Sequence, residues 1–138
     1  MFKKILFGLS LWLFATTLSF GANFDDGVNA YEKGDYKTAL TIFEDLAKKG
    51  DIDAQYNLGL MYDNGYGVKQ DYKKAFEWYE KAATQGIAEA QNNLGVMYDD
   101  GYGVRQDKKI AKELYGKACD GGFQIACDNY KILNQQGY

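Results

Sequence analysis

The chain has 138 residues, of which 46% are hydrophobic and 25% are charged, and its formal net charge is −3. This length supports one domain with a buried core, and the small acidic excess leaves no basic footprint for nucleic acid. Histidine is absent, which excludes histidine-based general-base catalysis and the usual catalytic zinc sites. We therefore expect no nucleic-acid partner, no metal and no cofactor.

Residues 1–21 have the pattern of a secretory signal peptide. Lys3 and Lys4 form a short basic start, residues 5–18 form an apolar stretch, and a small-x-small cleavage site ends at Gly21. The alternative is an uncleaved membrane anchor, for which this apolar stretch is short. The segment predicts cleavage after Gly21, a secreted or periplasmic protein, and no membrane span after cleavage.

Cleavage would also remove all the serine in the protein. Ser10 and Ser19 are the only serines in the sequence. The exported chain would therefore contain neither serine nor histidine, which excludes mechanisms with a serine nucleophile or a histidine base.

An internal repeat of 36 residues dominates the rest of the sequence. Residues 54–89 and 90–125 align without a gap, and 21 of the 36 positions are identical. Weaker copies flank this pair on both sides. The exported chain is therefore a single domain of repeats, with units at about 23–51, 52–87 and 88–123 and a terminal helix at 124–135.

Each unit is predicted to consist of two helices. In the first helix, small and large apolar residues recur at helical spacing and form one face (Ala54, Leu58, Met61 and Tyr62). The GYGV sequence at 65–68 breaks this helix, because glycine adopts positive φ readily.

The second helix of each unit has a start signal and a stop signal. Asp71 stands at the expected N-cap, and Asp35 and Asp107 occupy the same place in the flanking units. Gly86 closes the helix, and its apolar face follows the same spacing (Ala75, Phe76, Tyr79 and Ala82).

Gly59 and Gly95 lie inside predicted helices, where glycine costs about 1 kcal/mol relative to alanine. That cost is reasonable only where a neighbour packs too closely for a side chain. Since one unit cannot bury its own apolar face, stacked units must supply each other's core. The sequence therefore predicts an all-α protein, an α/α solenoid of helix pairs with a terminal helix.

The two central units resemble Sel1-like repeats. They share the pattern A-x-x-x-L-G-x-M-Y-x-x-G-x-G-V-x-x-D, followed by A-x-x-W/L-Y-x-K-A, over residues 54–125. The upstream unit, GVNAYEKGDYKTALTIFEDLA at 27–47, resembles instead a tetratricopeptide repeat with a shorter turn. Both resemblances imply stacked helix pairs.

The two cysteines, Cys119 and Cys127, flank a predicted helix turn. An antiparallel helix pair with so short a link can bring the two Cα atoms within disulfide range, and export would place them in an oxidising compartment. A catalytic thiol would need an activating base, and a metal site would need further soft ligands. A disulfide is the favoured interpretation.

This cysteine pair across a repeat boundary resembles the cysteine-rich Sel1-like family, the Helicobacter cysteine-rich proteins (Hcp). The resemblance implies an exported solenoid, and also penicillin binding with slow β-lactam hydrolysis. The family usually carries one pair in every repeat, whereas this chain has Ala83 and Gln91 one repeat earlier. Without serine or histidine, the residues favour a binding scaffold over a β-lactamase; a purely structural envelope component is the third possibility.

The first helices of a helical solenoid line its concave face, which is the usual binding surface. Asn57, Asn93 and Asn129 recur there at intervals of 36 residues, with Tyr56 and Asn92 beside them. Asparagine amides suit a peptide backbone or a carboxylate, so the expected partner is a protein, a peptide or a peptidoglycan-derived ligand. Alternatively, these residues are surface positions duplicated with the unit.

Two further groups of residues have simpler expected roles. Most of the 12 tyrosines are expected to fill the core or anchor loops rather than to stack on carbohydrate. Asp63 and Asp99, which precede the glycine turns, are expected to be solvated helix ends. A role for them as a carboxylate base or as cation ligands is the alternative.

Overall fold

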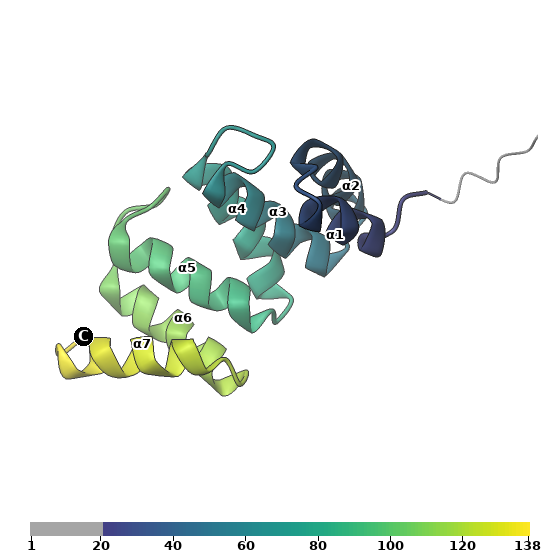
Figure 1. The fold of residues 1–138 in the computed structure, drawn as a ribbon. Coiled ribbons are helices and arrows are strands. Elements are labelled where there is room, and N and C mark those ends of the chain that lie inside the picture. The colour runs from purple at the N-terminus through teal and green to yellow at the C-terminus, as the bar shows by residue number, and fades with distance from the viewer. Residues whose placement is uncertain (1–20) are drawn as a thin grey trace, which may run out of the picture.

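The computed structural model describes residues 21–138, and this part of the chain is all-α. The expected signal peptide therefore lies outside the described residues, except for Gly21. Within residues 21–138, none of the helices is long and apolar enough to cross a membrane. Seven helices follow in chain order (Figure 1): α1 Phe24–Glu32, α2 Tyr36–Lys48, α3 Ile52–Asn64, α4 Tyr72–Thr84, α5 Ala88–Asp100, α6 Lys108–Asp120 and α7 Gln124–Gln135.

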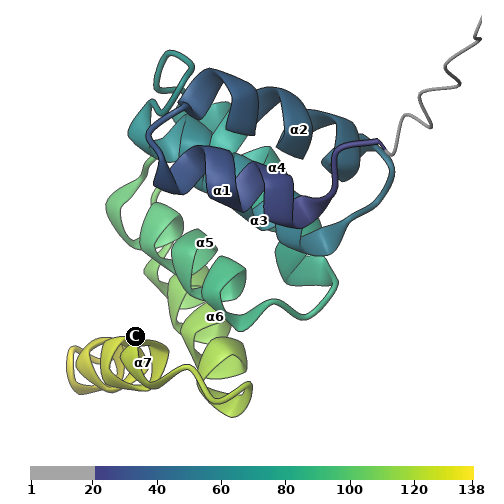
Figure 2. The ribbon, with the colours of Figure 1, turned by 45° about the vertical axis from the view of Figure 1, so that its right-hand side comes forward.

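The helices form a stack of pairs. Each helix packs mainly on the helices before and after it in the sequence. The pair α1–α2 lies at one end of the stack and the single helix α7 lies at the other, with α3 to α6 between them (Figures 1 and 2). This arrangement confirms the predicted α/α solenoid of helix pairs with a terminal helix.

Local capping interactions define the helix boundaries, as predicted. The side chains of Asp35, Asp71 and Asp107 each accept a hydrogen bond from a backbone N–H three residues later, which satisfies one of the unpaired donors at a helix start. Helices α3 and α5 end at Gly65 and Gly101 in the left-handed conformation, with φ of 71° and 76°. The repeated Asp and Gly positions therefore act as predicted.

The glycines inside the helices make room for aromatic rings of the paired helix. A Cβ at Gly59 would lie 2.5 Å from the Tyr79 ring, and a Cβ at Gly95 would lie 2.6 Å from the Tyr115 ring. This confirms the close packing inferred from the sequence. The rings of Tyr79 and Tyr115 are almost completely buried, so each glycine accommodates a large side chain of its unit's core.

Gly27 makes the same contact in the first unit, which the sequence analysis did not predict. A Cβ there would lie 2.6 Å from the Phe43 ring. The connection between α1 and α2 is four residues shorter than the one between α3 and α4, so the 36-residue register is lost in α1.

Helix α7 departs from the pattern of the first helices. By the 36-residue register, Lys131 takes the position of Gly59 and Gly95. Two aliphatic side chains of α7 are largely exposed, Ile125 at 57% and Ile132 at 51%. Within residues 21–138, helix α7 is thus the last helix of the stack, and it has no glycine at this position to receive a ring.

Candidate binding surface

The predicted asparagine positions lie on the first helices of successive units. Asn57, Asn93 and Asn129 occupy equivalent places on α3, α5 and α7. Three residues later, and so on the same side of each helix, stand Leu60, Val96 and Ile132. We call the surface that carries these six residues the inner face. It combines a row of amides with a row of aliphatic side chains.

A chain of amides joins α5 to α7. The Asn129 Nδ2 donates to the Asn92 Oδ1 at 3.2 Å, and the Asn92 Nδ2 lies 3.5 Å from the Asn93 Oδ1. Asn92 is only 6% exposed, and a buried amide is stable only when it is hydrogen-bonded. Asn92 therefore fixes the side chains of Asn93 and Asn129 relative to each other.

Asn57 is not part of this chain of amides. Its Nδ2 donates to the backbone carbonyl of Asp53 at 2.8 Å, within its own helix. The structure therefore brings Asn92, Asn93 and Asn129 together, and it leaves Asn57 in the neighbouring unit.

Tyr56 connects α3 to the amides of α5 and α7. Burial raises the pKa of the Tyr56 hydroxyl, the charge of Glu89 raises it further, and a hydrogen-bonding contact with Asn93 opposes both effects. The Tyr56 ring lies 6.0 Å from the Tyr79 ring. Four of the five predicted groove residues therefore form one polar cluster, which we call the amide cluster: Tyr56, Asn92, Asn93 and Asn129.

Asp63 is not a solvated helix end, so that prediction is wrong. Its carboxylate is half-buried and accepts a hydrogen bond from the Tyr79 hydroxyl at 3.0 Å. Burial raises the pKa of Asp63 above its ordinary value, and the bond from Tyr79 partly offsets this rise. The ring that packs over Gly59 carries its hydroxyl to Asp63, and this contact is invisible in the local sequence.

Asp99, the counterpart of Asp63, is also partly buried and forms an ion pair with Lys108. Burial raises the pKa of the Tyr115 hydroxyl, and the neighbouring Asp99 and Asp100 raise it further. Both carboxylates at this register position are therefore engaged with a partner from the second helix of their unit.

A small pocket of about 180 Å³ opens beside Asp63 and Asn93 on the inner face. The rings of Tyr72 and Tyr102 stack at its edge with their centroids 4.9 Å apart. This contact shows two tyrosines acting as loop anchors, as expected, because Tyr102 belongs to the second glycine turn. Tyr72 lies outside the repeated pattern, because Lys108 takes its place in the next unit. A carboxylate, an amide and apolar walls together suit a ligand that carries N–H donors.

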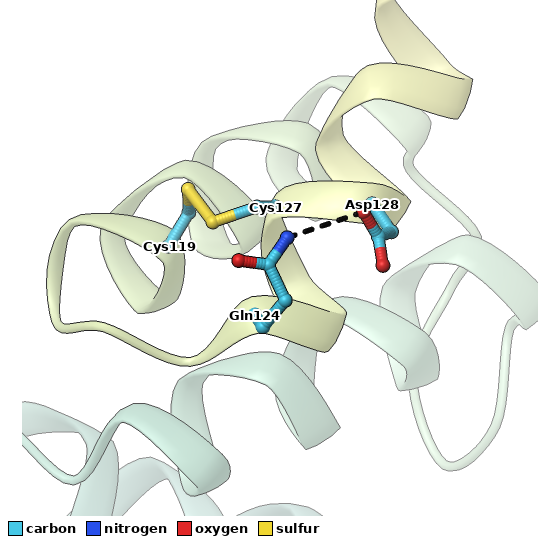
Figure 3. The surroundings of a disulfide bond; sticks show 4 residues. All are labelled: Cys119, Gln124, Cys127 and Asp128. Atoms are coloured by element: carbon cyan, nitrogen blue, oxygen red, sulfur yellow. Dashed lines mark hydrogen bonds between the residues drawn. A yellow bond between two sulfur atoms is a disulfide. The ribbon is translucent and has the colours of Figure 1, made fainter.

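The predicted disulfide is confirmed. Cys119 near the end of α6 is bonded to Cys127 in α7, with the two Cα atoms 4.6 Å apart (Figure 3). In the same turn of α7, the Gln124 Nε2 donates to the Asp128 Oδ1 at 3.3 Å. Because Asn129 follows two residues after Cys127, the disulfide also holds the C-terminal end of the amide cluster in place. Among residues 21–138, no group of three or more acidic or cysteine side chains is placed to hold a metal ion.

Comparison with known proteins identifies the repeat. The family model of the Sel1 repeat matches residues 52–87 and 88–123. No curated protein matches the chain.

Several solved structures share the fold. A Sel1 repeat protein from Oxalobacter formigenes superposes with a TM-score of 0.79 at 33% identity, over 83% of this chain and 47% of that one. A protective antigen of uropathogenic Escherichia coli with an SLR fold gives 0.63 at 30% identity, over 86% of this chain and 34% of that one. This chain therefore spans about half and about a third of their lengths.

Cysteine-rich protein B of Helicobacter pylori also superposes, with a TM-score of 0.62 at 22% identity, over 78% of this chain and 97% of that one. At this identity the likeness concerns the fold alone.

Proposed function

We propose that this chain, which belongs to the Sel1 repeat family, is an exported scaffold that binds a peptide segment of a partner protein on its inner face. Export is supported by the basic start, apolar stretch and cleavage site of residues 1–21. The stacked repeats support a binding role, because a solenoid offers an extended surface for a partner.

The amide cluster is the observation that carries the proposal. The Asn129 amide uses one N–H to reach Asn92, and it retains a second N–H and a carbonyl oxygen for a ligand. A donor and an acceptor on one side chain match the carbonyl and N–H of a peptide group. Because Asn92 and the disulfide hold this amide in place, a ligand pays little of the usual cost of ordering it.

The neighbouring residues also suit a peptide. Ile132 is half-exposed beside Asn129 and offers a contact for an aliphatic side chain. Asp63, at the small pocket near Asn93, offers an acceptor for N–H donors. A peptide presents all three kinds of group within a few residues, which favours it over a ligand built mainly of sugar rings.

The test is capture of defined ligands by the purified, oxidised protein. A peptide library and a set of muropeptides are offered separately, and bound material is identified by mass spectrometry. The proposal predicts capture of peptides, with at least a tenfold loss for the double variant N93A/N129A. Asn64→Ala is the matched control, because the exposed Asn64 side chain bonds only to its own helix.

Circular dichroism must show the same helical signal for all variants. Peptide capture that the N93A/N129A variant retains in full would refute the inner face as the binding surface. Capture of muropeptides alone would refute the peptide as ligand.

A further inference from the structure

A cavity lies away from the amide cluster, among α4, α5 and α6. Its volume is about 470 Å³, and its walls are polar and apolar in about equal parts. We call it the outer pocket. Its apolar lining comes from all three helices (Phe76, Leu94, Tyr98, Ile110 and Leu114). Glu80 and Lys117 supply opposite charges from α4 and α6.

The outer pocket and the amide cluster use nearly opposite sides of α5. With 3.6 residues per turn, Leu94 and Tyr98 share one side of this helix, and Asn93 and Val96 lie on the other. A ligand in the outer pocket would therefore not compete with a peptide on the inner face.

The preceding unit shows what fills the equivalent space. All ten residues that line the outer pocket have counterparts 36 positions earlier, and six of these counterparts are identical. Among the four that differ, Trp78 is replaced by Leu114 and Lys74 by Ile110. Most polar residues of the site are thus repeated. The second copy lacks the indole of Trp78, and it has Phe76 where the preceding unit has the smaller Leu40.

Trp78 shows how an indole ring sits in the preceding copy. The Trp78 ring packs against the core, and the Lys81 Nζ lies 4.2 Å from the ring centroid. This is the geometry of a cation–π contact. Lys117, the counterpart of Lys81, is retained beside the outer pocket. The cation therefore remains where the ring has been lost.

The acidic residue of the site also changes its partner. In the earlier unit, the Tyr62 hydroxyl donates to Glu44 at 3.3 Å. In the later unit, Tyr98 packs edge-on against Phe76 with ring centroids 5.6 Å apart, and among the described residues its hydroxyl makes no hydrogen bond to Glu80. Glu80 is therefore available as an acceptor at the outer pocket.

We propose that the outer pocket binds the indole side chain of a tryptophan displayed by a partner protein. The ring enters the space left by the shorter Leu114 and contacts Phe76 and Ile110. The Lys117 ammonium lies over the face of the ring, and Glu80 accepts a hydrogen bond from the indole N–H. Charge and shape thus match the two properties of indole, an electron-rich face and a donating edge.

The test uses N-acetyl-L-tryptophanamide as the probe and methyl NMR of the oxidised protein as the readout. Titration should shift the Ile110 and Leu114 methyl signals to saturation, and it should leave those of Leu60 on the inner face unchanged. N-acetyl-L-leucinamide is the control ligand, and its binding should be weaker because it has no ring for Lys117 to contact.

Two variants separate the outer pocket from a general loss of structure. Leu114→Trp restores the residue of the preceding unit, so the protein should fold and the probe should no longer bind. Lys117→Met keeps the side-chain length and removes the charge. It should weaken binding of the probe about two- to fivefold.

Three results would overturn the proposal: unchanged Ile110 and Leu114 signals in the wild type, wild-type affinity in Leu114→Trp, or wild-type affinity in Lys117→Met. The inner-face variant N93A/N129A should bind the probe normally, since its substitutions lie on the other side of α5. Failure of the outer pocket and failure of the inner face are therefore distinguishable.

Discussion

At the residue scale, the core repeats one contact between a helix glycine and an aromatic ring. Where the ring is Tyr79, its hydroxyl donates to Asp63, one turn after Gly59 on the same helix. In the first unit the ring is Phe43, which has no hydroxyl. When its partner Gly27 is aligned with Gly59, Tyr31 takes the position of Asp63. The carboxylate is thus present where a hydroxyl can satisfy it and absent where none exists.

This contact predicts opposite effects for two glycine-to-alanine substitutions. Gly59→Ala should lower the free energy of unfolding by about 1–3 kcal/mol, because its methyl group would overlap the buried Tyr79 ring. Gly116→Ala, also inside a helix, should raise it by about 0.5–1 kcal/mol, because a Cβ there would meet only the Tyr130 ring at 3.4 Å. Urea denaturation measures both. Equal effects of the two variants would contradict the role given to Gly59.

At the element scale, α7 is a terminal helix of the described stack, and α6 is its main neighbour. The additional attachments of α7 are the disulfide from Cys119 to Cys127 and the amide contact from Asn129 to Asn92. The position of the amide cluster therefore depends on covalent attachment at one end of the stack.

Removing the disulfide should loosen α7 before the rest of the stack. The double variant C119A/C127A should lose about 2–3 kcal/mol of stability on the chain-entropy model. Its amide hydrogen exchange should accelerate mainly in α7, and that in α3 and α4 should change little. Exchange that accelerates evenly along all seven helices would show that the disulfide does not act locally. Two free thiols in the unreduced, denatured wild type would show that it does not form.

At the scale of the whole molecule, the stacked repeats build an extended surface. The β-lactam hydrolysis implied by the Hcp resemblance would require a nucleophile or an activated water. Asp63 is the strongest candidate base, because burial raises its pKa, yet its carboxylate is already bonded to Tyr79.

We therefore expect nitrocefin hydrolysis by the purified protein to stay at or near the rate in buffer. Any slow turnover should depend on Asp63, so it should fall in Asp63→Asn and persist in Asp53→Asn, where the carboxylate is exposed. Fast turnover, or slow turnover insensitive to Asp63→Asn, would show that a different group performs the chemistry.

The repeat made most of the fold predictable from the sequence. The N-cap aspartates, the turn glycines and the buried glycines each recur in both copies of the repeat. Each position was therefore supported by two independent occurrences. The role of Gly27 was not predicted, because the shorter turn between α1 and α2 shifts Gly27 out of the 36-residue register. The disulfide was predictable because its cysteines flank a single short turn.

The candidate sites were less predictable, because they depend on contacts between units. The 36-residue register groups Asn57 with Asn93 and Asn129, but only the structure shows that Asn57 bonds within its own helix. Asp63 was misread because its partner Tyr79 belongs to the paired helix. The outer pocket was missed because three helices form it, and its signal is the exchange of Trp78 for Leu114 between otherwise similar units.

Lys131 affects where further repeats can be added to this protein. A lysine at the position of Gly59 and Gly95 would meet a ring packed as those of Tyr79 and Tyr115 are, so a unit duplicated after α7 would need a different contact there. The junction between residues 87 and 88 joins two Sel1 repeats of equal length. Gene duplication or protein engineering can therefore lengthen the array at this internal junction, where each added copy would extend the inner face by one 36-residue module.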